Sequence, residues 1–339
     1  MSAQEVKNAE LGDRRQQAAQ MKAVAKIRWA LVAALATFSG TALAQFAYVP
    51  NEKTGTLSII DLASDEVIGS IPAGKKPRGL VASLDRKTIY VSDQPNNALL
   101  IIDAAGRKVT SKIELGESPE GVDRSPDGKW IATAIEEDNA VYFIDSATGK
   151  IEFKVKTEGE NPEHAVFSPD GKWVYVSAEE SHVVDVIDVT ARKLAGMVQV
   201  GERPRGIGFT PDGSRAYVAC ELANTVYAID VATKKVIATI PAGVRSNGVK
   251  VHPSGKEVYV SNGTDGTVNV IDTTSNKITH TIKVGQRPWN MALTHDGSKL
   301  YVANGRSNNV SVIDMVAKKK IKDIAVGETP WGVLIPEGH

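Results

Sequence analysis

A repeat is the feature of this sequence that most constrains its fold. A short motif of the type Tyr-Val-x recurs seven times, at intervals of 42 residues with one interval of 43. An Ile-Asp pair, ending at Asp230 in one copy, keeps the same period, and a Ser/Thr-Pro-Asp-Gly turn sequence recurs in several copies. Repeats of this length are single supersecondary units that stack on one another to bury a shared core. The seven copies of the first motif begin at Tyr48, Tyr90, Ala132, Tyr175, Tyr217, Tyr259 and Tyr301.

Each repeat unit predicts four short β-strands. In one unit these are expected at Gly206–Phe209, around Tyr217, at Thr225–Ile229 and at Val236–Ile240. β-Branched residues in alternation are strand signals, and Gly, Pro, Asn and Asp at the breaks are turn signals. The pattern predicts an all-β fold, a seven-bladed β-propeller with four-stranded antiparallel blades. The Ile-Asp aspartates are expected to hydrogen-bond turns, and the glycines of the Asp-Gly turns to supply a positive φ.

The two ends of the repeat region are expected to meet. The region begins at a second strand, Phe46–Pro50, and ends at a first strand, Gly332–Ile335. The last blade would therefore combine N-terminal and C-terminal strands, which closes the ring and leaves no exposed strand edge between the first and last blades.

The first 44 residues have the order of a secretory signal peptide. An apolar run, Trp29–Phe38, follows basic residues and precedes the small-x-small sequence Ala42-Leu43-Ala44. We predict cleavage after Ala44, a propeller domain over residues 45–339 and a periplasmic product, with Met21 as an alternative start. The single cysteine, Cys220, excludes an internal disulfide and is expected to be a small residue at a strand end.

The charge balance argues against a general binder of polyanions. The formal net charge is zero, and the first 44 residues hold six basic and three acidic residues, so the cleaved product carries about three negative charges. Nucleic acid is therefore an unfavoured partner, although a local basic patch remains compatible with this balance.

The Tyr-Val-x-Asn strand, the Ile-Asp pair, the Val-Gly-x-x-Pro-x-Gly loop and the Ser-Pro-Asp-Gly turn resemble the YVTN-repeat propeller family over essentially the whole of Phe46–Gly338. Seven repeats behind a signal peptide most resemble the propellers associated with catabolism dependent on pyrroloquinoline quinone (PQQ). That resemblance implies a periplasmic accessory protein that works with a quinoprotein dehydrogenase and an ABC transporter. The Trp-docking repeat of the quinoprotein dehydrogenases is absent from the sequence, so no PQQ or other cofactor is predicted.

Function is expected where the repeats differ from one another. The first strand of each blade should line the central channel, so the residues on either side of the loop proline should surround the channel mouth. These positions hold several arginines and two tryptophans, which suit a protein partner or a small polar ligand. The predicted binding residues are Arg78, Glu120, Glu163, Arg203, Arg205, Arg245, Asn247, Arg287, Trp289 and Trp331.

The charges at this mouth are expected to fall into sectors. Two adjacent blades are rich in acidic residues, including Glu120 and Glu163, and the blades on either side are rich in arginine. Opposed potentials of this kind steer and orient a docking partner. Arg205 is expected to be exposed, so its substitution should weaken binding with little effect on stability, whereas substitution of Asp230 should do the opposite.

The sequence is compatible with three classes of function. A non-catalytic binding or scaffold role is favoured, because no GxSxG motif, Cys–His pair or phosphate-binding glycine loop is present. A lactonase-like hydrolase that uses channel carboxylates such as Glu120 and Glu163 is the first alternative. A propeller that binds single-stranded DNA, as YncE-like proteins do, is the second. His164 and His182 are the only candidates for a metal site, at a spacing that matches no known motif.

Overall fold

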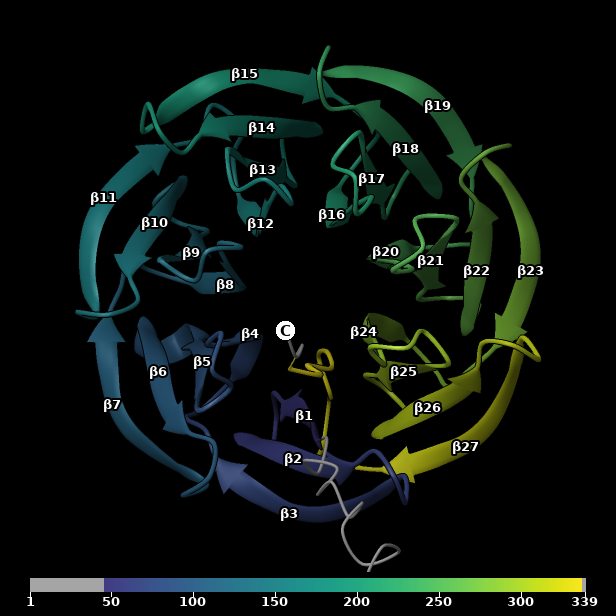
Figure 1. The fold of residues 1–339 in the computed structure, drawn as a ribbon, viewed down its shortest axis with the longest axis horizontal. Coiled ribbons are helices and arrows are strands. Elements are labelled where there is room, and N and C mark those ends of the chain that lie inside the picture. Colours follow the sequence, from purple (N-terminus) through teal and green to yellow (C-terminus); the bar gives the residue numbers. More distant parts are fainter. Residues whose placement is uncertain (1–45, 337–339) are drawn as a thin grey trace, which may run out of the picture. The chain divides into compact units, whose positions relative to one another are not determined.

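A computed structural model describes residues 46–336, which form seven antiparallel sheets arranged around a central axis (Figure 1). Six sheets have four strands, and the seventh has three strands completed by the C-terminal segment. The chain is therefore an all-β, seven-bladed propeller, as the repeat predicts. The described residues contain one 3-10 turn, η1 (Gln94–Asn96), and no helix long and apolar enough to cross a membrane.

The blades follow the chain in order, and each runs from an inner first strand to an outer fourth strand (Figure 1). Blade 1 contains β4 (Pro77–Ala82), β5 (Thr88–Asp93), β6 (Ala98–Asp103) and β7 (Lys108–Glu114); blade 2 contains β8 (Pro119–Arg124), β9 (Trp130–Ile135), β10 (Ala140–Asp145) and β11 (Lys150–Lys156); blade 3 contains β12 (Pro162–Phe167), β13 (Trp173–Ala178), β14 (Val183–Asp188) and β15 (Lys193–Gln199).

The remaining blades repeat this plan. Blade 4 contains β16 (Pro204–Phe209), β17 (Arg215–Cys220), β18 (Thr225–Asp230) and β19 (Lys235–Pro241); blade 5 contains β20 (Ser246–Val251), β21 (Glu257–Asn262), β22 (Thr267–Asp272) and β23 (Lys277–Lys283); blade 6 contains β24 (Pro288–Leu293), β25 (Lys299–Asn304), β26 (Asn309–Asp314) and β27 (Lys319–Ala325); blade 7 contains β1 (Phe46–Asn51), β2 (Thr56–Asp61) and β3 (Glu66–Pro72).

The two ends of the described chain meet in blade 7, as expected. Tyr48 and Leu334 exchange two backbone hydrogen bonds of 2.8 and 2.9 Å, and the Trp331 N–H donates to the Pro50 carbonyl at 2.9 Å. The C-terminal segment pairs through isolated bridges and not through a continuous ladder. The predicted signal peptide and its cleavage site at Ala44 lie outside the described residues.

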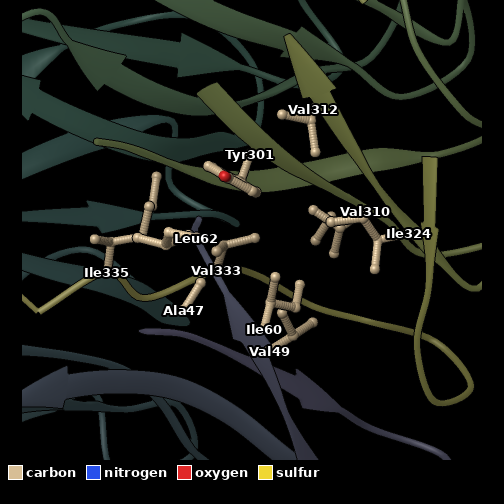
Figure 2. Packing of buried hydrophobic residues seen from close by; sticks show 12 residues of the cluster. Ala47, Val49, Ile60, Leu62, Tyr301, Val310, Val312, Ile324, Val333 and Ile335 are labelled. Atoms are coloured by element: carbon tan, nitrogen blue, oxygen red, sulfur yellow. The ribbon is translucent and has the colours of Figure 1, made fainter. Parts of the chain in front are cut away.

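The hydrophobic core lies between neighbouring blades. Between blades 6 and 7, Ala47 and Val49 of β1 and Ile60 of β2 pack against Tyr301 and Val310, together with Val333 and Ile335 of the C-terminal segment (Figure 2). Burial of an aliphatic side chain of this size contributes roughly 1.5–3 kcal/mol. The C-terminal segment therefore contributes apolar burial as well as hydrogen bonds to the closure of the ring.

The repeated turn residues have the structural roles expected of them. Asp230 accepts hydrogen bonds from the Thr233 N–H at 2.8 Å and from the Thr233 hydroxyl at 2.7 Å, and the other Ile-Asp aspartates accept similar bonds from the turns that follow them. Gly171 of a Pro-Asp-Gly turn has a φ of 71°. Cys220 ends β17, where it is fully buried, and burial raises the pKa of its thiol to about 12.

Candidate functional site

One backbone hydrogen bond builds the same face of every blade. The residue directly after the second strand donates its N–H to the carbonyl of the residue before the first strand, over 2.8–3.4 Å in all seven blades. The register of the first strand shifts just after its opening residue, so the residue that follows the loop proline leaves the ladder. The loops before the first strands and the loops after the second strands form one surface, which we call the mouth face. It carries the residues that the sequence analysis selected.

Glu221 is the centre of an ion-pair network on this face. Its side chain is fully buried, and its carboxylate contacts Arg205 Nε at 3.0 Å and Arg287 Nη2 at 2.7 Å. Arg203 and Arg245 also lie within 3.5 Å of it. From the sequence, Glu221 is expected only to dilute the charge of the basic sector, and its contacts with four arginines are evident only in the structure.

Arg205 occupies the middle of the network and is not the exposed residue that the sequence analysis expected. Its side chain is 15% exposed, and it contacts Glu163 at 2.6 Å as well as Glu179 and Glu221. Arg78 similarly joins Glu52, at 2.6 Å, to Glu120. Glu120 and Glu163, which were expected in an acidic surface sector, are therefore paired with Arg78 and Arg205 beneath the mouth face.

Burial and pairing drive the pKa values of these carboxyl groups apart. Burial would raise the pKa of Glu163, but the guanidinium groups of Arg205 and Arg78 and the neighbouring His164 lower it to about 2. Burial and the charge of Glu163 raise the pKa of Glu179 to about 8. The same two causes raise the pKa of Glu120 well above its usual range. The network thus holds an ionised carboxylate beside carboxyl groups that tend to retain a proton.

Neither candidate histidine belongs to a set of potential metal ligands. The His164 ring lies 5.4 Å from the Trp331 ring, between centroids, and burial lowers the pKa of His164. His182 accepts a hydrogen bond from the Arg203 N–H at 3.3 Å through Nδ1. Within residues 46–336, the one group of three possible ligands is Glu120, Glu136 and Glu163. Arg78 and Arg205 already neutralise two of those carboxylates, which leaves little negative charge for a cation.

Seven of the ten predicted binding residues line one small cavity of about 70 Å³ at the centre of the mouth face. Glu120 lies buried behind Arg78, and Arg203 and Arg245 contact carboxylates outside the cavity. A cavity of this size accommodates a few water molecules at most. The seven residues are Arg78, Glu163, Arg205, Asn247, Arg287, Trp289 and Trp331.

A much larger pocket, of about 980 Å³, opens beside this cavity on blades 5 and 6. Arg287 and Trp289 line both spaces. The pocket also includes Lys283 and Arg306, which are exposed and form no ion pair among the described residues. Pockets of several hundred Å³ suit small-molecule ligands, whereas the central cavity does not. The described chain is thus a seven-bladed propeller whose mouth face carries a compensated ion network and one open, basic pocket.

Comparison with known proteins places this propeller in a family. The family model described as "Lactonase, 7-bladed beta-propeller" matches residues 118–199 and 194–325, which together exceed half of the chain, so the chain belongs to that family. A model described as "YNCE-like beta-propeller" matches residues 26–128. No curated protein sequence matches the chain.

Several solved structures share the fold. A functionally unknown protein from Desulfotomaculum acetoxidans has a TM-score of 0.77 at 18% identity, over 87% of this chain and 99% of that one. Kuenenia stuttgartiensis hydrazine synthase has a TM-score of 0.68 at 21% identity, over 76% and 88%. Dihydro-heme d1 dehydrogenase NirN in complex with DHE has a TM-score of 0.64 at 14% identity, over 86% and 75%. Identities this low establish the likeness of fold alone.

Proposed function

We propose that this protein is an exported, non-catalytic binding propeller that captures an anionic ligand, or an acidic segment of a partner, on its mouth face at blades 5 and 6. The observation that carries the proposal is the basic pocket of about 980 Å³. Lys283 and Arg306 face it without an acidic partner among the described residues, whereas the arginines at the centre of the mouth face are already paired. Unpaired cations in a concave site attract anions.

The arrangement of the carboxylates supports binding over catalysis. The two acidic residues that line the pocket are engaged: Asp265 accepts a hydrogen bond from the Val244 N–H at 2.8 Å, and Asp323 from the Ser311 hydroxyl at 2.6 Å. The glutamates with shifted pKa values lie in the buried network. A general base must reach the substrate proton within hydrogen-bond distance, and these groups are held by arginines instead.

Lactone hydrolysis is the second candidate, favoured by the family match and by the pair Glu163 and Glu179, whose pKa values diverge. Divergent carboxyl groups are a recurring feature of acid–base sites. A panel of sugar and aliphatic lactones tests it. Hydrolysis by the wild type that disappears in Glu179→Gln would replace the binding proposal, and no hydrolysis of any lactone would leave it in place.

The cellular setting follows from the resemblance to PQQ-associated propellers and is also proposed. The partner would be a quinoprotein dehydrogenase or a transporter component in the periplasm. Single-stranded DNA fits less well, because the carboxylates beneath the mouth face neutralise most of its arginines.

Charge reversal in the pocket tests the binding proposal. Immobilised protein 45–339 is used to capture partners from periplasmic extract, and the captured species are compared with those held by a Lys283→Glu, Arg306→Glu double variant. Lys235→Glu, on the outer strand β19, is the matched control. Capture of an acidic species by the wild type and the control but not by the double variant is expected. Equal capture by all three would overturn the proposal.

A further inference from the structure

One repeated position separates blades 5 and 6 from the other five. The residue directly after the second strand occupies the same place in every blade, because its N–H always donates to the carbonyl that precedes the first strand. Five blades carry a long polar side chain there, and the two adjacent blades 5 and 6 carry glycine. In blade order from blade 7, the residues are Glu52, Gln94, Glu136, Glu179, Glu221, Gly263 and Gly305.

The long side chains at this position fill and neutralise the mouth face. Glu52 pairs with Arg78, and Glu179 pairs with Arg203 at 2.9 Å. Glu136 accepts a hydrogen bond from the Ser118 hydroxyl. Five blades therefore each place an occupied polar side chain between the neighbouring loops.

The backbone conformation does not explain why glycine stands at these two positions. Neither Gly263 nor Gly305 has a positive φ, so a residue with a side chain can adopt the same conformation. The missing side chains leave room that neighbouring side chains occupy. A Cβ at Gly263 would lie 2.9 Å from Arg287 Nη1, and a Cβ at Gly305 would lie 2.9 Å from Trp289 Cζ3. Arg287 and Trp289 thus lie where the side chains of the other blades would begin.

The same two glycines change the local charge. Both line the pocket of about 980 Å³, which we now call the glycine pocket. Two carboxylates that the repeat pattern would supply here are missing, and Arg245 and Arg287 share the single carboxylate of Glu221. Lys283 and Arg306 have no carboxylate among the described residues. The glycine pocket is consequently both an open space of about 980 Å³ and a basic region with few compensating carboxylates.

We propose that the glycine pocket is a binding site for a small organic anion that combines a carboxylate or phosphate group with a flat apolar ring. This inference rests on the proposed function and narrows it to one ligand class and one place. Arg306, Lys283 and the outer edges of Arg245 and Arg287 supply charge-assisted donors for the anionic group. The indole of Trp289, which lines the pocket, supplies the surface on which a ring packs.

The first experiment defines the ligand class with simple probes. Binding of benzoate, phenyl phosphate, acetate and benzylamine to the protein 45–339 is measured by calorimetry and by Trp fluorescence. The aromatic anions are expected to bind at least tenfold more tightly than acetate and than benzylamine. Failure of both aromatic anions to bind, or equal binding of benzylamine, would overturn the inference.

The second experiment restores the side chains that the other blades carry. Gly263→Glu and Gly305→Glu place a side chain against Arg287 and Trp289 and add a negative charge to the pocket, and Gly263→Gln adds the side chain without the charge. All three are expected to weaken binding of phenyl phosphate at least tenfold, with the two Glu variants affected most and Lys235→Glu unaffected. Unchanged binding in a folded Glu variant would overturn the inference. Arg306→Ala, an exposed change, gives a readout independent of folding, with an expected loss of about fivefold.

These outcomes separate the inference from the proposed function. Capture of a partner that depends on Lys283 and Arg306 but not on the glycine variants would leave the proposed function standing and remove the small-molecule site. Probe binding that the glycine variants abolish, without any charge-dependent capture of a partner, would keep the site and limit the protein to small ligands.

Discussion

Arg205 illustrates how ring geometry alters the meaning of a residue. In the sequence it stands in a variable position of a surface loop, next to Arg203. In the structure its guanidinium joins Glu163, Glu179 and Glu221, which come from two blades. An arginine is suited to this because its planar group presents five donors in a fixed arrangement. Its chief contribution in the described chain is to stability, and a ligand can reach only the small part of it that remains exposed.

The first prediction therefore reverses the order of stability losses expected from the sequence, with Arg205→Ala more destabilising than Asp230→Ala. Arg205→Ala leaves the buried carboxylate of Glu163 without its ion-pair partner, and removal of one member of a buried pair costs about 3–5 kcal/mol. Asp230→Ala removes hydrogen bonds in an exposed turn and should cost less. Chemical unfolding of both variants measures the difference. A larger loss of stability for Asp230→Ala would contradict the ion-pair network.

The second prediction concerns the protonation of Glu179. Its pKa is raised to about 8, from an ordinary value near 4.5, by burial and the charge of Glu163. The folded state therefore binds a proton that the unfolded state releases, so this contribution to stability is complete below about pH 4.5 and is lost as the pH rises through about 8. Glu163, whose pKa is lowered, acts in the opposite direction and only below about pH 4.5.

Melting temperatures between pH 5 and 9 test this account. The wild type should become less stable across the range, and Glu179→Gln, which mimics the protonated acid, should show a shallower slope. A residual slope is expected from Glu120, whose pKa is raised for the same reasons. Parallel slopes for the two proteins would show that Glu179 is ionised in the folded state.

At the scale of the blade, the sequence predicts most of the features that depend on residues near one another in the chain. Strand alternation, the Pro-Asp-Gly turns and the Ile-Asp aspartates act over a few residues, so the repeat predicts them in every copy. The blade boundaries and the pairing of both ends follow from the same pattern. Two blades lack the loop glycine, blade 3 with His164 and blade 6 with Asn290. In blade 3 the register shift at the start of the first strand is also shorter than in blades 1, 2, 4, 5 and 6.

The periodicity of the sequence does not predict the contacts between blades. Arg287 of the blade 6 loop pairs with Glu221 after β17, in a blade that is not adjacent, and Trp331 meets His164 across the channel. Such pairs depend on ring closure and side-chain length. The glycines were accessible in principle, because aligning the position after each second strand shows Gly263 and Gly305 against glutamates. The charge sectors expected from the sequence include glutamates at that position but do not single out the two glycines.

At the scale of the whole molecule, closure of the ring depends on few bonds. Neighbouring blades are joined by a covalent chain at every boundary within the repeat, and blade 7 alone is assembled from two distant segments. Its inner segment pairs with β1 at two isolated bridges. Apolar contacts compensate for this sparse pairing, since Trp331, Val333 and Ile335 are all more than nine-tenths buried.

The last prediction concerns this closure. Deletion of residues 331–339 removes the hydrogen bonds to Tyr48 and Pro50 and the burial of Trp331, Val333 and Ile335, each worth roughly 1.5–3 kcal/mol. It also exposes the inner edge of β1 to pairing with other chains. The truncated protein should melt at least about 10 °C lower, or aggregate. Deletion of residues 337–339 alone is the control and should leave the melting temperature unchanged. A truncated protein as stable as the control would mean that six blades and an incomplete seventh hold the ring without the C-terminal segment, because the remaining interfaces between blades would then suffice.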